Sequence, residues 1–414
     1  MMNYPLLYRI QQRFDMTSIQ DVPGMVRREF SRLDVGKNVQ PGQRVAVTAG
    51  SRGIDNLIPI TATVVECLRN VGLKPFILPA MGSHGGATAE GQVKLLSELG
   101  ITESSIGAPI TSTMDVVSLG TVDSGAEVFI SKDVLEADHL VLINRVKPHT
   151  AFRGEVESGL CKMLTVGCGK HEGALNMHKF DLAASIIPAA RIILEKAPVL
   201  FGLAIVENSA DRTHTMRFVL PEQFVETDRE LLKLAWKFLP RIPLEELDIL
   251  VVDEMGKNIS GAGIDPNVVG FWRREGGPRK PDYRTIIVLD LTPQSDGNAL
   301  GIGLTDLTTR RVIDKVNIQA TYANALTTGI WGSTRLPIAL ENDRAVLETA
   351  LSHVSDLDHV RMVRIVNTLH LENFWATEAL LPELREKEKL IVDETPVQLR
   401  FDEEGRLHPF PDEH

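Results

Sequence analysis

The stretch RVAVTAGSR at residues 44–52 decides the fold, because it is a short apolar run that ends abruptly in small residues. A helical pattern follows from about Ile58 to Asn70, and a second apolar run, PFILPAMGSHGG, occupies residues 75–86. Buried runs that alternate with helical patterns predict parallel strands joined by crossover helices. The first half of the chain is therefore expected to form an α/β domain around a parallel sheet.

Three of the apolar runs lead directly into residues that can carry chemistry. Arg52 follows the first run and His84 follows the second. A third run, HLVLINRV at residues 139–146, continues into KPHTAF, which contains His149. Open parallel sheets bind ligands beyond the carboxyl ends of their strands. We therefore predict that Arg52, His84 and His149 lie at one edge of the sheet and face one crevice.

The second half of the chain repeats the same alternation after a junction near Pro240. The run DILVVDEM at residues 248–255 restarts the strand pattern, and RTIIVLDLTP at residues 284–293 continues it. The predicted fold class is α/β with two domains. Residues 1–244 would form a Rossmann-like N-terminal domain that carries the catalytic residues. Residues 245–414 would form a smaller α/β domain that closes over a substrate cleft between the two.

Composition and charge limit the class of protein. The 414 residues are 43% hydrophobic and 24% charged, and the net charge of −11 argues against a nucleic-acid partner, since binding to phosphates depends on Lys and Arg. The three cysteines match no disulfide framework or zinc motif, which favours a reducing compartment. The N-terminus lacks the pattern of a signal peptide, and no apolar run is long enough to span a bilayer. We expect a cytoplasmic protein without a membrane partner.

Chemistry-bearing residues are densest in the run NRVKPHTAFRGEVESGLCKMLTVGCGKHEGALNMHK at residues 144–179, which contains His149, Lys162, His171 and His178. Its many small residues cannot fill a core, so the run is typical of a reaction site built from loops. Lys162 in this setting could lose its proton and act as a nucleophile or attachment point, but a surface lysine at a helix start is an equally good interpretation. For His171, an exposed helix position is the better interpretation.

Other motifs also have a structural interpretation beside the functional one. The glycines of MGSHGGAT leave His84 uncovered, although they could also form a tight turn in which His84 caps a helix. The run DEMGKNISGAGIDPN offers Glu254 and Lys257, and Lys257 could meet an anionic group, but a plain loop explains this run equally well. Trp331, in TTGIWGSTRLP, could close over a ligand, yet an exposed aromatic beside an arginine is also common at interfaces.

Taken together, these residues resemble the nickel-pincer lactate racemase family over nearly the whole chain. His84 and His149 match the two catalytic histidines of that family, and Lys162 matches the lysine to which the cofactor is joined. His178 lies 16 residues after this lysine and matches the histidine that ligates nickel. Arg52 matches an arginine that binds an anionic group.

The resemblance implies an isomerase that racemises or epimerises a 2-hydroxy carboxylate by transient hydride transfer. The implied cofactor is the nickel-pincer nucleotide, pyridinium-3-thioamide-5-thiocarboxylic acid mononucleotide with nickel, attached covalently to Lys162. His84 and His149 would act as acid and base on the substrate hydroxyl from opposite sides. The implied partners are the small-molecule substrate and the enzymes that synthesise the cofactor; the oligomeric state is not implied.

Some positions depart from the family pattern. Ala49 stands where the family has an acidic residue, and Gly85 replaces a basic residue after the first catalytic histidine. Glu254 occupies the place of an amide in the lactate enzyme, while Lys257 aligns with a pocket lysine and Trp331 is a further candidate substrate contact. A carboxylate at Glu254 would repel dicarboxylic substrates and could accept hydrogen bonds from hydroxyl groups. A polyhydroxy acid is therefore a better expectation than lactate.

Two other classes of function are compatible with the same residues. His84, His149 and His178 could instead hold zinc or manganese and activate water for hydrolysis or elimination. The chain could also bind an anionic metabolite through Arg52 and Lys257 without catalysing a reaction.

Overall fold

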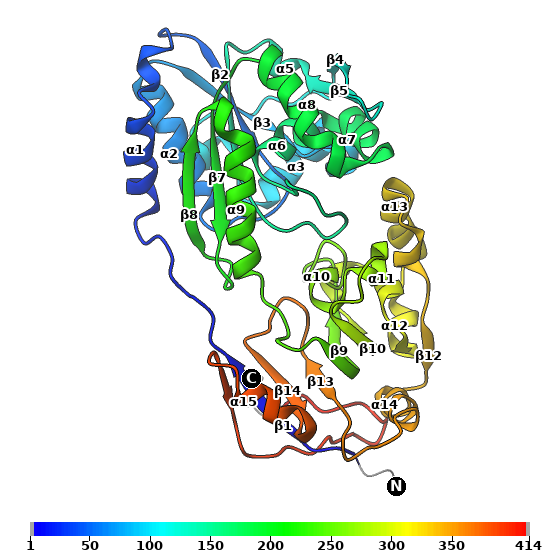
Figure 1. Ribbon diagram of the computed structural model, residues 1–414. Helices are drawn as coiled ribbons and strands as arrows, with labels where there is room; N and C mark the ends of the chain where they lie inside the picture. The colour runs from blue at the N-terminus through cyan, green and yellow to red at the C-terminus, as the bar shows by residue number, and fades with distance from the viewer. Residues whose placement is uncertain (1–3, 411–414) are drawn as a thin grey trace. The chain divides into compact units, whose positions relative to one another are not determined.

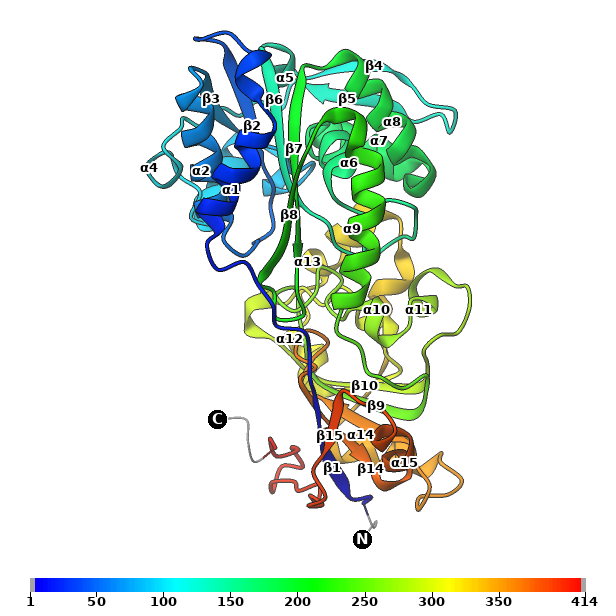
Figure 2. The same cartoon turned by 60° about the vertical axis from the view of Figure 1, so that its left-hand side comes forward.

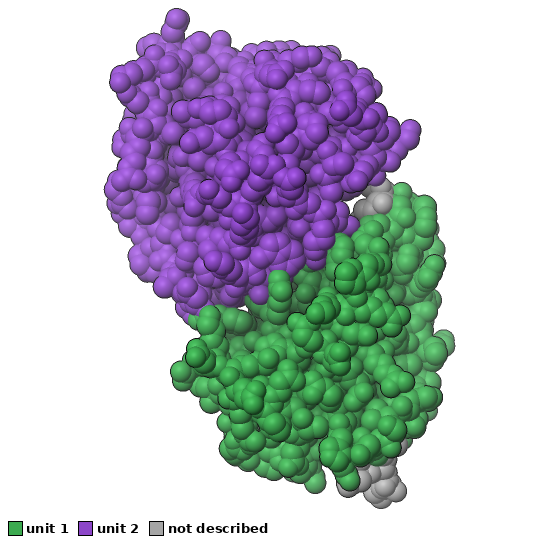
Figure 3. Space-filling view, in the orientation of Figure 1, with its two compact units in different colours: residues 1–14, 240–414 green, residues 15–239 purple. Residues whose placement is uncertain are grey.

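A computed structural model of the chain describes residues 4–410, except for the side chains of residues 324, 327 and 328. The chain divides into two compact units, which Figure 3 shows in different colours. Residues 15–239 form one unit, and the other combines the N-terminal residues up to Phe14 with the chain from Pro240 onward. Within the described residues, no helix is both long and apolar enough to cross a membrane.

The unit of residues 15–239 is built on a five-stranded sheet in the order β3-β2-β6-β7-β8 (Figure 1). The first four strands are parallel and the last is antiparallel. These strands are β2 (Arg44–Ala49), β3 (Lys74–Pro79), β6 (His139–Arg145), β7 (Val199–Glu207) and β8 (Thr213–Val219). Every residue of β2 and β3 after the first is buried, as expected for parallel strands covered on both faces.

Helices cover both faces of this sheet (Figures 1 and 2). One core lies beneath α1 (Val22–Arg32), α2 (Leu57–Asn70), α3 (Ala89–Glu98) and α4 (Glu103–Ile106). The other lies beneath α6 (Leu160–Lys162), α8 (Leu182–Lys196), α9 (Phe224–Phe238) and the hairpin of β4 (Val116–Thr121) and β5 (Glu127–Ser131). The short helix α5 (Lys132–Leu135) follows β5, and α7 (Lys170–Lys179) precedes α8.

The strand order places a topological switch point between β2 and β6. The chain runs from β2 through α2 to β3 on one side, and then returns to the other side of β2 as β6. The loops after β2 and β6 therefore turn away from each other at the carboxyl edge of the sheet. Ligands of doubly wound α/β proteins bind at such a point.

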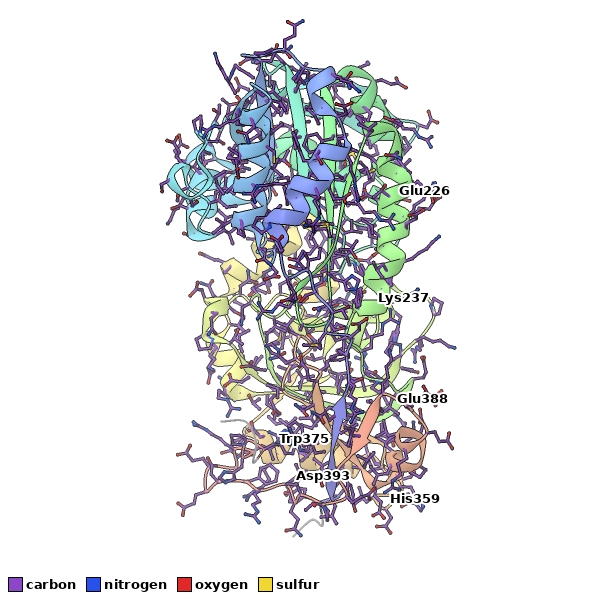
Figure 4. The ribbon with its side chains drawn as sticks, turned by 90° about the vertical axis from the view of Figure 1, so that its left-hand side faces the viewer. Glu226, Lys237, His359, Trp375, Glu388 and Asp393 are labelled. Carbon is purple, nitrogen blue, oxygen red and sulfur yellow. The ribbon has the colours of Figure 1, made fainter. Side chains whose placement is uncertain are left out.

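The second unit contains an eight-stranded sheet in the order β12-β11-β10-β9-β13-β14-β1-β15, in which the first five strands are parallel and the last three antiparallel. Its strands are β1 (Leu7–Gln12), β9 (Glu246–Met255), β10 (Asp282–Leu291), β11 (Leu307–Thr309), β12 (Ile338–Leu340), β13 (Met362–Ile365), β14 (Asn373–Thr377) and β15 (Leu390–Val392). Its helices are α10 (Pro266–Val269), α11 (Trp272–Glu275), α12 (Arg310–Lys315), α13 (Ile318–Thr328), α14 (Asp343–Ser352) and α15 (Leu381–Arg385). Trp375 of β14, labelled in Figure 4, stacks on Phe410.

The α/β class with two units built on largely parallel sheets confirms the expected fold class, but the division of the chain differs in two respects from the ranges predicted from the sequence. The N-terminal segment was assigned to the domain of residues 1–244, whereas β1 pairs with β14 and β15 of the other sheet. The reason is burial, since Leu7 and Ile10 are completely enclosed in the cores of that unit. The later division falls before Pro240 rather than after residue 244.

Candidate functional site

Three neighbouring parallel strands deliver three of the expected site residues to one edge of the five-stranded sheet. Arg52 follows β2, His84 follows β3 and His149 follows β6, and these strands are adjacent in the order β3-β2-β6. Because the strands are parallel, their carboxyl ends lie at the same edge. The three loops therefore leave the same edge of the sheet, at the switch point or beside it.

His84 is exposed and does not serve as a helix cap. It precedes the 3-10 turn η2 (Gly85–Ala87), but its side chain makes no capping hydrogen bond. Its Nδ1 atom instead makes a short hydrogen bond with Ser51 Oγ, which comes from the loop after β2. Gly85 is required beside it, since its φ is +66° and a Cβ atom would lie 2.6 Å from the backbone nitrogen of Gln92.

His149 is held by contacts on both its backbone and its ring. Its peptide N–H donates a hydrogen bond to Glu157 Oε2 at 2.7 Å, and its Nδ1 accepts one from the peptide N–H of Ala151 at 3.0 Å. Because Nδ1 is an acceptor, the neutral ring carries its proton on Nε2. The ring packs on Phe152 with 4.5 Å between ring centroids. In this form His149 Nε2 is a hydrogen-bond donor, and the contact with Ala151 orients the ring.

Lys162 is the last residue of α6 and is followed by a π-helical turn, η3 (Met163–Gly167). Such turns are rare and occur often at functional sites. Its Nζ atom lies 5.5 Å from the ring centroid of Phe152, which links it to His149. Burial and the charge of Arg52 lower the pKa of Lys162 to about 7, against the opposing effect of Glu157. Near neutral pH, about half of these amines are uncharged and nucleophilic.

The start of α6 is fixed by a buried carboxylate. Asp228 accepts hydrogen bonds from the peptide N–H groups of Leu160 at 3.0 Å and Cys161 at 2.8 Å. Gly159 precedes them with a φ of +98°, and a Cβ atom there would lie 2.2 Å from Asp228 Oδ1. Burial raises the pKa of Asp228 to about 7. The glycine and the carboxylate together determine where the helix that carries Lys162 begins.

His178 lies in the last turn of α7, on the same helix as His171. Burial and, secondly, the charge of Lys162 lower the pKa of His178 to about 4. Its imidazole is therefore neutral at physiological pH, which is the form that binds metal ions. His171 is half-buried rather than exposed, and its buried Nδ1 has no hydrogen-bond partner among the described residues.

Positive charge gathers near these residues. Arg145, the last residue of β6, pairs with Glu207, and burial together with the charge of Arg145 lowers the pKa of Arg52. The charge of Arg52 in turn affects Lys162. Sequence reasoning did not select Arg145, although the rule that selected Arg52, a position at the end of a parallel strand, applies to it as well. Arg52 and the partly protonated Lys162 suit an anionic ligand, while the charge of Arg145 is balanced by Glu207.

Two further side chains, those of Glu157 and Ser51, could not be predicted as site residues because nothing in the sequence distinguishes them. Glu157 is one of several acidic residues in the glycine-rich run, and its role depends on burial beside the peptide N–H of His149. Burial raises the pKa of Glu157, while hydrogen bonds and neighbouring cations lower it. Ser51 is one of many serines, and only the fold places it against His84.

No group of three His, Cys, Asp or Glu side chains in the described part of the chain is arranged to hold a metal ion. Burial raises the pKa of the thiol of Cys161, and it raises the pKa of Cys168 to about 12, so both thiols stay protonated. This is the behaviour of structural cysteines.

The remaining candidate residues belong to the other unit. Glu254 lies near the end of β9, and its Oε1 accepts a hydrogen bond at 3.1 Å from Asn367, which follows β13. The Lys257 ammonium donates to the carbonyl of Gly261 at 2.6 Å, within its own loop. Trp331 begins a 3-10 turn and is 60% exposed. β9 and β13 flank the switch point of this second sheet, so Glu254 also occupies a ligand-binding position of the fold.

Comparisons with known proteins point to one family. Residues 35–184 match the family model described as the lactate racemase N-terminal domain. Seven solved chains match, including the lactate racemase apoprotein from Thermoanaerobacterium thermosaccharolyticum, with 14% identity, a TM-score of 0.54, and coverage of 87% of this chain and 98% of that one. No curated protein matches the chain. The segment matched by the family model contains Arg52, His84, His149, Lys162 and His178.

Proposed function

We propose that the chain is a homologue of lactate racemases and racemises or epimerises a 2-hydroxy carboxylate, on the strength of the match of residues 35–184 to the lactate racemase N-terminal domain. The observation that carries the proposal is the surroundings of Lys162. A lysine whose pKa is lowered to about 7 lies directly before a π-helical turn, within electrostatic reach of both His178 and Arg52. An ordinary surface lysine has none of these features.

The residues present fit a covalently attached nickel-pincer nucleotide. Lys162 would carry it through its amine, and the neutral imidazole of His178 would supply a nitrogen ligand to nickel, a metal for which imidazole is a suitable donor. Arg52 and Arg145 would bind a negative group of the nucleotide or the carboxylate of the substrate. When bound, this cofactor supplies a reversible acceptor for the hydrogen at C2 of the substrate.

Two histidines would handle the hydroxyl proton of the substrate. His84 and His149 come from different strands at the same sheet edge, and each would take the proton from one stereoisomer and return it to the other. Ser51 would orient His84 through its Nδ1, and Ala151 would orient the ring of His149. To take a proton at Nε2, His149 must first carry its ring proton on Nδ1, which breaks its hydrogen bond from Ala151. Both rings then present Nε2 to the substrate.

The substrate is proposed to carry more than one hydroxyl group. Glu254 is half-buried, and one of its carboxylate oxygens already accepts a hydrogen bond from Asn367. The carboxylate can only accept further hydrogen bonds when ionised, so it would bind a hydroxyl donor and repel a second carboxylate. A polyhydroxy or sugar-derived monocarboxylic acid meets both conditions.

We place the protein in the cytoplasm, together with the enzymes that synthesise its cofactor. All three cysteines are free and buried, which suits a reducing compartment. A covalently bound cofactor made by other enzymes requires those enzymes to act in the same compartment.

The test is turnover of individual stereoisomers of 2-hydroxy acids by the protein loaded with cofactor, followed by chiral chromatography. We expect interconversion without deuterium uptake at C2 in D2O, and at least a ~100-fold loss of kcat in both His84→Ala and His149→Ala. Turnover that needs only zinc or manganese would favour a hydrolase or lyase. Binding without turnover, unaffected by the two histidine substitutions, would favour a metabolite-binding protein.

A further inference from the structure

A completely buried lysine lies at the start of the helix that carries His178. Lys170 is the first residue of α7 and has no exposed surface. Its backbone adopts a φ of +54°, which is unfavourable for a residue with a side chain. Strained conformations of this kind persist only when surrounding contacts hold them. The contacts of Lys170 therefore hold its side chain and backbone in this conformation.

The ammonium of Lys170 connects the helix to the end of β3. Its Nζ donates to the carbonyl of Pro79, the last residue of β3, at 2.7 Å, and to Gln92 Oε1 at 3.3 Å. Gln92 belongs to α3 and is also completely buried. A buried polar pair needs well-formed hydrogen bonds, since each lost partner costs about 1–3 kcal/mol.

Gln92 continues this connection into the loop that carries His84. Its Nε2 donates to the carbonyl of Gly82 at 2.8 Å and to that of His84 at 3.4 Å. The same loop is fixed from the other side, because the peptide N–H of Gly82 donates to the carbonyl of Gly167 in the π-helical turn at 3.3 Å. The chain of hydrogen bonds thus runs from α7 through α3 to the backbone of His84.

We propose that Lys170 and Gln92 are positioning residues that set the His84 loop against the segment carrying Lys162 and His178. The inference rests on the proposed function, in which these three residues serve one reaction. Neither residue of the pair reaches the surface, so neither touches substrate. Their effect is on the place of the His84 imidazole, through the carbonyls of Gly82 and His84 itself.

The decisive variant is Gln92→Glu. A carboxylate of nearly the same shape keeps an acceptor for Lys170 but removes the N–H groups that bind the two loop carbonyls. If Gln92 served only as a hydrogen-bond acceptor for Lys170, the protein would tolerate this change. If Gln92 positions the His84 loop, the change should displace the loop, because the carbonyls of Gly82 and His84 would then face a negatively charged carboxylate. Gln20→Glu is the matched control, since Gln20 is exposed and its side chain, among the described residues, bonds to Ser18.

The first readout needs neither cofactor nor activity. Diethyl pyrocarbonate modifies accessible imidazoles, and peptide mass spectrometry gives the rate for His84 relative to the exposed His359 of the other unit. In Gln92→Glu we expect His84 to react at least about threefold faster, because a displaced loop loosens its hydrogen bond to Ser51. Gln20→Glu should match the wild type.

The second readout is the kinetics of the loaded enzyme. We expect kcat to fall about tenfold in Gln92→Glu while KM changes less than about twofold, because a misplaced acid–base group affects the reaction more than binding. Unchanged reactivity of His84 and an unchanged kcat in a folded variant would overturn the inference. Failure of the variant to fold would also overturn it, since the pair would then be a stability element.

Different results would refute the proposed function and the positioning role of Lys170 and Gln92. A loaded wild type that converts no 2-hydroxy acid would refute the proposed function, and the reactivity of His84 in the unloaded protein would still decide the role of the pair. A wild type that converts its substrate beside a Gln92→Glu variant with the same kcat would leave the function intact and remove the positioning role.

Discussion

At the scale of single residues, the surroundings of each side chain determine which of the 44 lysines and arginines can take part in a reaction. The resemblance to the lactate racemase family was enough to select Lys162 and His178. It did not reveal that burial and neighbouring charges keep both groups partly or wholly neutral near pH 7. Nor did it distinguish Glu157 or Lys170, whose roles arise from contacts with segments far away in the sequence. Residue type is therefore readable from sequence, while protonation state depends on packing.

The lowered pKa of Lys162 predicts selective reactivity in the unloaded protein. With acetic anhydride, Lys162 should be acetylated faster at pH 7 than the exposed Lys94, because about half of its amines are uncharged there. The rate for Lys162 should level off above pH ~8. Peptide mass spectrometry over pH 6–10 measures both rates in one sample. Equal rates at pH 7 would contradict the assignment.

The same shift predicts a dependence of stability on pH. Between the folded pKa of about 7 and the ordinary lysine value near ~10.4, the unfolded chain binds more protons at Lys162 than the folded chain does. The free energy of unfolding therefore rises with pH between these two pKa values. Lys162→Met, which lacks the group, should be more stable than the wild type at pH 7 and lose this advantage towards pH 10. Urea midpoints at both pH values measure the difference; a constant difference would refute it.

At the scale of elements, apolar runs and their small-residue ends predicted the strands that became β2, β3 and β6, and the helix expected from about Ile58 became α2. Local sequence patterns reflect the burial and the periodicity that each strand or helix requires of its own residues. The π-helical turn after Lys162 was not predictable, since no local pattern marks it. The position of α6 depends on Asp228, which is 66 residues away from Lys162 in the sequence.

The start of α6 predicts a strong effect of a small substitution. Gly159→Ala would place a Cβ atom against Asp228 at a backbone φ that disfavours side chains, and should destabilise the protein by about 2 kcal/mol or more. Gly36→Ala is the control, because its nearest contact lies 4.0 Å away and its φ is not positive. Urea denaturation should show a lower midpoint for the first variant only. Similar midpoints for both would mean that Asp228 moves aside without cost.

At the scale of the whole molecule, the cores follow the two units rather than the order of the sequence. Two hydrophobic clusters contain only residues between Val22 and Phe238. The other two combine Leu7 or Ile10 with residues from Ile242 to Phe410. Sequence analysis could not assign the first strand, because strand pairing across more than 350 residues leaves no local signal.

This division predicts how fragments behave. Residues 15–239 should fold alone, since both of their cores are complete. Residues 240–414 alone should not, because β14 and β15 would lose the strand that lies between them. Adding a peptide of residues 1–14 should restore a cooperative thermal transition, monitored by circular dichroism. A fragment of residues 240–414 that melts cooperatively without the peptide would show that β1 is dispensable.

The proposed attachment of a nickel cofactor to Lys162 can be tested on the protein itself. The chain and its Lys162→Ala variant are produced together with the cofactor-synthesis enzymes, and intact mass and nickel content are measured for each. We expect added mass and about one nickel ion per wild-type chain, with both lost in the variant. An unmodified, nickel-free wild-type chain, beside a lactate racemase that is loaded in the same cells, would contradict it.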